Sequence, residues 1–358
     1  MKVLVIASHS GGHILPAIAF CQGLQGRDNR VEINFIATDG EIERKLLGNN
    51  FNPIFFRRKK ITILSSFSLI KLFFQAHRLI KRTSPDLIVG FGGYLSIPFI
   101  ICAYFKRIPN FIHEQNMRIG LANLFLMNFS DKIIFSFPNT KISDKLKNKA
   151  LFLGIPLRKE MVRIDRQQAR RYFGLDDEKF TLLVTGGSQG SLKINTQIIE
   201  VLKEKEFSDI QVIHIAGLFD YERVAEEYKK LNIKSKVFSL FDHMNYAFCA
   251  CDLAICRAGA GTIAEIAAFR IPSILIPYPY AKLHQLDNAR FLVDKGAAVL
   301  LEDKFLCKPI LKEVITSLKN NPDRLKQLSE SLGNIDNLDA RDRMAELALT
   351  LAQCNYSR

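Results

Sequence analysis

The amino-acid sequence predicts an α/β protein with two Rossmann-like, doubly wound parallel-sheet domains that face an interdomain cleft. Two observations support this fold class. Short runs of β-branched and apolar residues alternate with longer helical patterns along the 358 residues, which is typical of parallel α/β layers. The pattern restarts near residue 151, and the chain is long enough for two domains of ordinary size.

The first half of the chain supplies one set of strands and helices. Apolar and β-branched runs predict strands at residues 2–7, 31–37, 53–56, 86–91, 110–113 and 132–136. Stretches with helical spacing lie between them at residues 14–25, 41–48, 66–82 and 117–128. Because each helix follows a strand and leads to another, the pattern predicts parallel strand pairing.

The second half repeats this organisation after a short linker. Residues 151–158 contain Gly154 and Pro156 and are interpreted as a crossing between the domains. Asp165 is the expected N-cap of a helix at 166–173. Further strands are predicted at residues 180–185, 210–215, 235–239, 252–256, 272–276 and 297–300. We therefore expect an N-terminal domain at 1–155, a C-terminal domain at 156–337, and a C-terminal helix within 338–358 that packs on either domain.

Composition excludes several classes of protein. Apolar residues make up 48% and charged residues 24%, a globular balance that excludes a disordered or collagen-like chain. Lys and Arg outnumber Asp and Glu by 50 to 36, and residues 1–155 carry +12 of the net +14 (21 basic, 9 acidic), so an anionic partner is expected at the first half. The seven cysteines form no C-x-x-C pair, which argues against a zinc ribbon or disulfide framework and favours a reducing cytoplasm.

One charge-free stretch tests whether the chain spans a membrane. Leu87 to Phe105 contains nineteen uncharged residues, long enough on paper to cross a bilayer. Glycines and Pro98 interrupt it, so a buried strand, a glycine turn and a short buried helix are expected instead. The N-terminal residues form a strand-like run without the pattern of a signal peptide.

Glycine-rich runs stand at the strand-to-helix junctions where such sheets bind ligands. They are Ser8–His13, Gly90–Tyr94, Gly186–Gly190 and Arg257–Gly261. Helix N-termini at these junctions present unpaired N–H groups that favour anions. Two runs in each half therefore predict two anionic ligands in the cleft, whereas the simpler alternative is that the glycines only form tight turns.

The run before Glu265 gives the clearest ligand signal. Residues 258–265 open a helix whose glycines allow a diphosphate to approach the N-terminus, and Glu265 lies one turn in, where a carboxylate can accept hydrogen bonds from a ribose. The alternative for Glu265 is an acid that stabilises the helix dipole. A P-loop motif is absent, as is a dinucleotide-binding G-x-G-x-x-G after the first strand, which argues against phosphoryl transfer and nicotinamide chemistry.

Taken together, these motifs resemble the MurG family of bacterial glycosyltransferases. The resemblance rests on Ser10–His13, Gly92–Pro98, His113–Asn116, Gly154–Arg158, Gly186–Gly190, Cys256–Glu265 and His284–Asn288, in this order from residue 3 to about residue 300. It implies a GT-B fold and inverting transfer of N-acetylglucosamine from UDP-N-acetylglucosamine to undecaprenyl-diphosphate-linked muramoyl-pentapeptide (lipid I), giving lipid II in peptidoglycan synthesis. It implies no metal and no cofactor. His9, where the family has glycine, and Ile155 in the linker depart from the family pattern.

The resemblance also implies roles for individual residues. Ser10, Gly11, Gly12 and Asn116 would approach the sugar, and Arg158 and Ser188 the nucleotide and its diphosphate. Phe241 would offer its backbone to uracil. The diphosphate would be held by Ala260, Gly261, Thr262, Ile263 and Ala264, the ribose by Glu265, and the sugar hydroxyls by Gln285. For Arg158 the alternative is a surface charge on the linker.

Transfer with inversion needs a base for the acceptor hydroxyl. His13 is the best candidate, because it follows Gly11 and Gly12 at a strand's carboxyl end and its ordinary pKa of about 6.5 suits the task. The alternative is a histidine that orients the acceptor diphosphate or caps the helix. Glu114, next to His113, is the second candidate for the base.

A basic amphipathic segment predicts an anionic membrane surface as a partner. Residues 51–85 contain eight Lys or Arg side chains and no acid, interleaved with apolar residues from Leu64 to Phe74. A core-facing helix with a solvated basic face is the alternative, and the glycine runs give no support to nucleic-acid binding. We expect a peripheral protein on the cytoplasmic face of the plasma membrane.

Two other functions remain open on sequence alone. A related GT-B enzyme could use another lipid acceptor, such as diacylglycerol, although residues 92–98 and 113–116 argue against it. A non-catalytic UDP-sugar-binding protein would keep the glycine runs and need no base.

Overall fold

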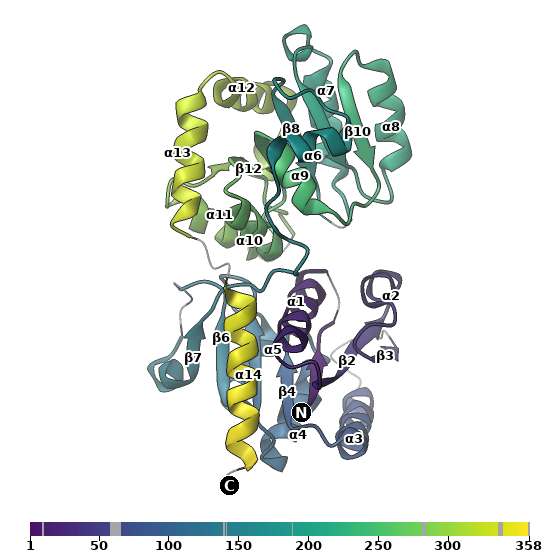
Figure 1. The fold of residues 1–358 in the computed structure, drawn as a ribbon, viewed down its shortest axis with the longest axis vertical. Coiled ribbons are helices and arrows are strands. Elements are labelled where there is room, and N and C mark those ends of the chain that lie inside the picture. Colours follow the sequence, from purple (N-terminus) through teal and green to yellow (C-terminus); the bar gives the residue numbers. More distant parts are fainter. Residues whose placement is uncertain are drawn as a thin grey trace. The chain divides into compact units, whose positions relative to one another are not determined.

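A computed structural model describes residues 1–8, 11–57, 66–138, 140, 142–187, 189–280, 284–335 and 339–356 (Figure 1). The chain divides into two compact units, Met1–Lys159 with Asn337–Arg358, and Glu160–Asp336. Each unit is a parallel sheet with helices on both faces. The predicted pair of Rossmann-like domains is therefore confirmed.

The first unit is built on a seven-stranded parallel sheet with the order β3-β2-β1-β4-β5-β6-β7. Its strands are β1 (Lys2–Ile6), β2 (Glu32–Asp39), β3 (Pro53–Arg57), β4 (Leu87–Gly90), β5 (Asn110–Glu114), β6 (Lys132–Phe135) and β7 (Ala150–Phe152). Alternate residues of β1 enter different cores: Val3 and Val5 pack on one face, and Leu4 and Ile6 on the other. Burial on both faces explains why the strands read as continuous apolar runs.

Two layers of helix cover this sheet. The core on one face includes α1 (Gly11–Arg27) and α14 (Ala340–Tyr356), with α2 (Glu41–Leu47) beside them. The core on the other face includes α3 (Ser66–Thr83), α4 (Ser96–Lys106) and α5 (Leu121–Leu126), followed by the 3₁₀ turns η1 (Met127–Phe129) and η2 (Asp144–Lys149). A methyl group at Gly23 would lie 2.7 Å from Cγ of Arg341, so the glycine permits α1 and α14 to approach closely.

The second unit repeats the topology with a six-stranded sheet in the order β10-β9-β8-β11-β12-β13. Its strands are β8 (Thr181–Thr185), β9 (Gln211–Ile215), β10 (Lys234–Phe238), β11 (Leu253–Cys256), β12 (Ser273–Leu275) and β13 (Val299–Leu300). Its helices are α6 (Arg166–Phe173), α7 (Leu192–Leu202), α8 (Tyr221–Lys230), α9 (Met244–Ala250), α10 (Ala260–Phe269), α11 (His284–Val293), α12 (Lys308–Lys319) and α13 (Pro322–Gly333), with the 3₁₀ turns η3 (Lys205–Phe207) and η4 (Asp303–Phe305). Residues from α7, α8, α12 and α13 form the core of one face.

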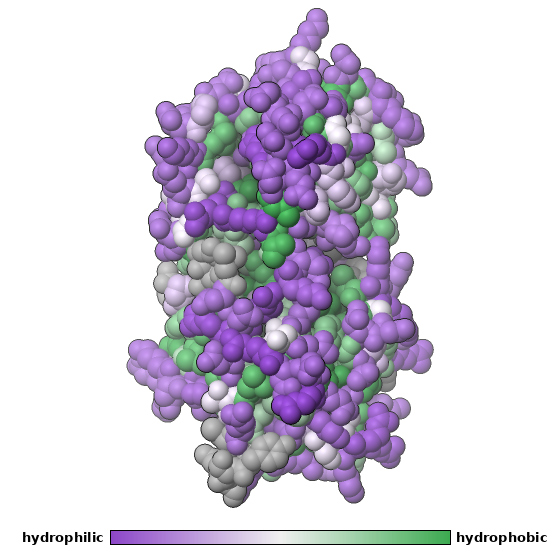
Figure 2. All heavy atoms as spheres, in the orientation of Figure 1, coloured by the Kyte–Doolittle hydropathy of each residue, from purple (hydrophilic) through white to green (hydrophobic). Residues whose placement is uncertain are grey.

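Several local predictions are confirmed. The carboxylate of Asp165 accepts a hydrogen bond from the Gln168 amide (2.9 Å) and caps α6. The charge-free stretch 87–105 forms β4, a glycine turn and most of α4, and none of the described helices is long and apolar enough to cross a membrane. Figure 2 shows a face on which hydrophilic residues predominate and hydrophobic residues gather in small patches.

Two local predictions are wrong. The helix expected at 117–128 begins only at Leu121, because Glu114 accepts hydrogen bonds from the amides of Asn116 and Gly120 and holds the intervening residues in a loop. The linker expected from residue 151 begins later, since Ala150–Phe152 pairs with β6 as a seventh strand. The C-terminal helix packs on the first unit, against α1.

Candidate functional site

The strand order reverses at one place in each sheet. In the first unit β1 lies between β2 and β4, and in the second unit β8 lies between β9 and β11. Ligands of doubly wound sheets bind beside the carboxyl ends of the strands at such a switch point. The four glycine-rich runs follow β1, β4, β8 and β11, the strands that flank the two switch points. The fold therefore gives each unit one candidate site.

The glycine turn after β4 shapes the first site. Gly92 and Gly93 have φ values of +87° and +78°, a conformation that side chains disfavour. A methyl group at Gly92 would lie 2.9 Å from Cε1 of His13, and one at Gly93 would collide with the Ser8 hydroxyl. Both glycines are therefore needed for the turn to pack against the segment after β1. Gly11, Gly12 and His13 form the first turn of α1, while Ser10 lies outside the described residues.

His13 stands in a polar cluster at this switch point. Its Nδ1 lies 3.0 Å from Oε1 of Gln115, the residue after β5. Burial lowers the pKa of His13 below its ordinary value of 6.5, although the charge of Glu114, the hydrogen bond with Gln115 and the Phe91 carbonyl act in the opposite direction. Burial also lowers the pKa of His113 to about 4. Both imidazoles are therefore neutral at pH 7, and a neutral imidazole can accept a proton.

Glu114 has a different environment from His13. Glu114 is only 2% exposed, and its carboxylate accepts hydrogen bonds from the backbone amides of Asn116 (3.0 Å) and Gly120 (2.9 Å). The side chains of Asn116 and Asn123 donate two more, at 3.4 and 2.9 Å. The carboxylate therefore anchors the loop 116–120, and its oxygens are occupied by protein donors.

The second site is the start of α10. Gly259 is the N-cap residue, and no described side chain caps the helix there, so its first N–H groups are suited to an anion. Ala260 to Ala264 form the first turns, and Glu265 follows them, half-buried. Two side chains of α11 form hydrogen bonds with the adjoining loops. Oε1 of Gln285 accepts a hydrogen bond from the Tyr278 backbone amide (2.9 Å), and the Asn288 side chain donates one to the Ala258 carbonyl (3.3 Å).

A buried arginine beside this turn was missed by the sequence reasoning. Arg257 is 8% exposed and donates to Asp303 (2.6 Å), to the Ser191 hydroxyl (2.7 Å) and to the Ile276 carbonyl (3.1 Å). It thus joins the starts of α7 and α10, which follow the two glycine runs of this unit. The sequence carried one signal for this residue, an arginine directly after an apolar strand. Such an arginine is expected to be buried, and a buried guanidinium needs an acidic partner.

The remaining predicted residues belong to other segments of the chain. The ring of Phe241 packs on Phe238 and Phe173, with centroids 4.6 and 5.4 Å apart, after the carboxyl end of β10. Arg158 is half-exposed in the irregular segment after β7. Ser188 lies outside the described residues. Within the first unit the fold brings together Gly11, Gly12, His13, Glu114 and Asn116, and within the second it brings together residues 260–265.

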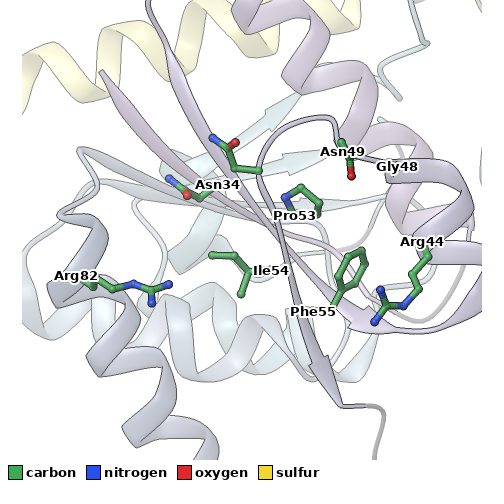
Figure 3. A pocket seen from close by; sticks show the side chains of 9 residues that line it. Asn34, Arg44, Gly48, Asn49, Pro53, Ile54, Phe55 and Arg82 are labelled. Carbon is green, nitrogen blue, oxygen red and sulfur yellow. The ribbon is translucent and has the colours of Figure 1, made fainter.

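A hollow of about 670 Å³ lies elsewhere in the first unit (Figure 3). It is lined by residues near the amino ends of β2 and β3, including Asn34 and Pro53, and by Arg82 of α3. Arg44 on its rim is paired with Asp39 (2.7 Å) and covers the Phe55 ring. Because ligands of this fold bind at the carboxyl ends of strands, the hollow is not the candidate site. Among the described residues, no group of three or more His, Cys, Asp or Glu side chains could hold a metal ion.

Comparison with known proteins places the chain in a family. Residues 3–135 match the glycosyltransferase family 28 N-terminal domain, and residues 181–344 match its C-terminal domain. The UDP-N-acetylglucosamine–N-acetylmuramyl-(pentapeptide) pyrophosphoryl-undecaprenol N-acetylglucosamine transferase of Desulforamulus reducens is 34% identical, covering 92% of this chain and 93% of that protein. The enzyme of the same name from Thermodesulfovibrio yellowstonii is 33% identical, covering 98% and 99%.

A solved structure supports the same assignment. Acinetobacter baumannii MurG superposes with a TM-score of 0.78 at 26% identity, covering 98% of this chain and all of the other. The chain therefore belongs to glycosyltransferase family 28 and, within it, to the MurG family of N-acetylglucosamine transferases.

Proposed function

We propose that this chain transfers N-acetylglucosamine, with inversion, from UDP-N-acetylglucosamine to undecaprenyl-diphosphate-linked muramoyl-pentapeptide and so forms lipid II. The observation that carries the proposal is the placement of all four glycine runs at the two switch points, in a chain whose relatives carry this activity in their names. One unit would then hold the donor and the other the acceptor.

The donor is assigned to the second unit. The uncapped N-terminus of α10 would receive the diphosphate, with residues 260–264 supplying backbone N–H groups. Glu265 lies far enough along the helix for its carboxylate to accept hydrogen bonds from the ribose. Gln285 would contact the sugar hydroxyls, Phe241 the uracil, and Ser188 the nucleotide with its diphosphate, together with Arg158, which stands at the end of the first segment of the first unit. A helix N-terminus also stabilises the charge that develops on departing UDP.

The acceptor and the base are assigned to the first unit. Ser10, Gly11, Gly12 and Asn116 would approach the transferred sugar. His13 would take the proton from the acceptor hydroxyl as its oxygen attacks the anomeric carbon and the bond to UDP breaks. Its neutral imidazole at the switch point supports this role. The four donors already bound to Glu114 leave that carboxylate less suited to it.

An exposed apolar surface on the same unit supports the proposal of a lipid-linked acceptor. Large apolar side chains are exposed on three neighbouring helices, including Phe74 of α3 (73%), Phe105 of α4 (75%) and Leu121 just after Gly120 (75%). Lys106 and Arg107 are exposed beside Phe105. Exposed apolar side chains with basic neighbours suit the surface of an anionic bilayer. We assign the protein to the cytoplasmic face of the membrane as a peripheral protein.

The sequence predicted only part of this surface. The basic segment 51–85 includes α3, but the exposed residues of α4 and α5 lie beyond it, and residues 58–65 are outside the described residues. The contribution of α4 and α5 depends on the packing of α4 against α3 and of α5 against α4, which the sequence did not show.

Turnover with labelled donor tests the proposed function. Radiolabelled UDP-N-acetylglucosamine is incubated with polyprenyl-diphosphate-linked muramoyl-pentapeptide or with diacylglycerol, in detergent and in anionic vesicles. Label should move to the muramoyl-peptide lipid only, and His13→Gln should abolish the transfer. Transfer to diacylglycerol instead would identify another acceptor class, and donor binding without transfer to either would leave a UDP-sugar-binding protein.

A further inference from the structure

A continuous chain of hydrogen bonds links His13 to the segment after β7. Nδ1 of His13 lies 3.0 Å from Oε1 of Gln115, and Nε2 of Gln115 lies 3.0 Å from Nδ1 of His113. Nε2 of His113 then lies 3.0 Å from the carbonyl oxygen of Gly154. His113 and Gln115 are at most 1% exposed, so these groups have no solvent with which to exchange hydrogen bonds.

The Gly154 end of this series of hydrogen bonds determines which atoms carry the hydrogens. The Gly154 carbonyl can only accept, and the Ser136 hydroxyl, 3.3 Å from Nε2 of His113, gives its own hydrogen to the Glu114 carbonyl (2.8 Å). Nε2 of His113 must therefore carry the proton. In a neutral ring Nδ1 is then an acceptor, so Gln115 must present its NH₂ group to it.

A second contact fixes the same orientation of the amide. Nε2 of Gln115 lies 3.1 Å from the Phe91 carbonyl, which also can only accept. The two contacts together place Oε1 of Gln115 toward His13, and an amide oxygen cannot donate. Nδ1 of neutral His13 therefore carries its proton, and its Nε2 carries the lone pair.

We propose that Gln115 is a positioning residue that holds His13 in the tautomer whose Nε2 can accept a proton from the acceptor hydroxyl. The inference rests on the proposed role of His13 as the base. Gly92 assists, since its missing side chain lets the glycine turn lie against the His13 ring. The arrangement resembles a base oriented by a third group, with an amide in place of a carboxylate. Among the described residues, the titratable groups that act on His13 are Glu114 and His113, both on β5.

Two substitutions of Gln115 separate the effect of its hydrogen-bond acceptor from the effect of its side-chain volume. Gln115→Met keeps the volume but accepts no hydrogen bond, so both His13 tautomers should populate and kcat should fall about 10–100-fold with little change in donor KM. Gln115→Glu keeps an acceptor for Nδ1–H but loses the donor to the Phe91 carbonyl and to Nδ1 of His113, so the His13 tautomer should persist while the stability of the protein falls. The introduced charge should raise the pKa of His13 and move the acid limb of kcat/KM to higher pH.

A buried glutamine in the other unit provides the matched control. Gln211 is fully buried, and its amide binds the backbone of Asp176 (2.7 and 2.9 Å) and the Thr181 hydroxyl (2.9 Å). Gln211→Met should lower stability to a similar degree without changing the His13 tautomer or the pH profile. A merely structural role for Gln115 would give the same result as this control.

NMR of the full chain labelled with ¹⁵N-histidine reads the tautomer without reference to activity. The His13 signals are identified by their loss in His13→Gln. The wild type should show a protonated Nδ1 and an unprotonated Nε2 at pH 7.5. A protonated Nε2 in the wild type, or an unchanged tautomer in Gln115→Met, would overturn the inference. Full kcat in His13→Gln would instead refute the proposed base, which the NMR signals do not test.

Discussion

The buried ion pair between Arg257 and Asp303 predicts how strongly the second unit depends on one carboxylate. The nitrogen–oxygen distance is 2.6 Å, and the two side chains are 10% and 12% exposed. Asp303→Asn removes the charge and leaves the guanidinium buried, which typically costs about 3–5 kcal/mol. Lys193 also pairs with Asp303 (3.1 Å) but is 43% exposed, so Lys193→Gln should cost at most about 1 kcal/mol.

Urea unfolding of the full chain measures this difference. Circular dichroism is the suitable signal, because the sequence contains no tryptophan. Burial acts to raise the pKa of Asp303, but hydrogen bonds from Arg257 and Lys193 outweigh it and hold the pKa below its ordinary value. The stabilisation should therefore be present at pH 7 and be lost as the pH falls below about 3.8. The reasoning is wrong if Asp303→Asn and Lys193→Gln unfold at the same urea concentration.

Three further predictions concern donor binding, acid stability and the membrane. Glu265→Ala should raise the KM for UDP-N-acetylglucosamine about 10–100-fold, because a hydrogen bond to a charged group contributes roughly 1.5–3 kcal/mol; an unchanged KM would refute the ribose contact. Burial lowers the pKa of His113 to about 4 and that of His214 to about 3, so the free energy of unfolding should decrease by roughly 1 kcal/mol per pH unit for each histidine as the pH falls below 6.5, and a constant value from pH 7 to 5 would contradict this. Phe105→Ser should weaken co-sedimentation with anionic vesicles about tenfold or more, whereas Tyr280→Ser on the second unit, 82% exposed, should not; equal loss in both would argue against the proposed surface.

The strands could be predicted because their burial on both faces leaves a simple pattern. Leu87–Gly90 and Leu253–Cys256 are short apolar runs with a glycine or polar turn after them, and both stand within a residue or two of their predicted positions. The same alternation placed the glycine runs at strand-to-helix junctions, whereas the strand order and its switch points came from the structure. The Asp165 cap was predictable because it depends on residues three apart.

Contacts between distant residues could not be predicted in this way. The Arg257–Asp303 pair joins residues 46 apart, and nothing local in η4 marks Asp303 as its partner. Gln115 stood in a recognisable motif, but its orientation depends on Phe91 and Gly154, which the fold brings to it from other elements. The late start of α5 has a similar cause, since Glu114 holds the chain out of the helix until Gly120.

The return of α14 to the first unit has a consequence for the order of folding. Met344, Ala345, Ala348 and Ala352 are at most 1% exposed in the core shared with α1, so that core is incomplete until α14 has been synthesised. The second unit, in contrast, is continuous in sequence and is synthesised entirely before α14. On the ribosome the second unit can therefore fold first, although its sequence comes later. The core of the first unit that α14 covers stays exposed until then. Emergence of α14, rather than of the N-terminal half, would complete the unit that carries His13.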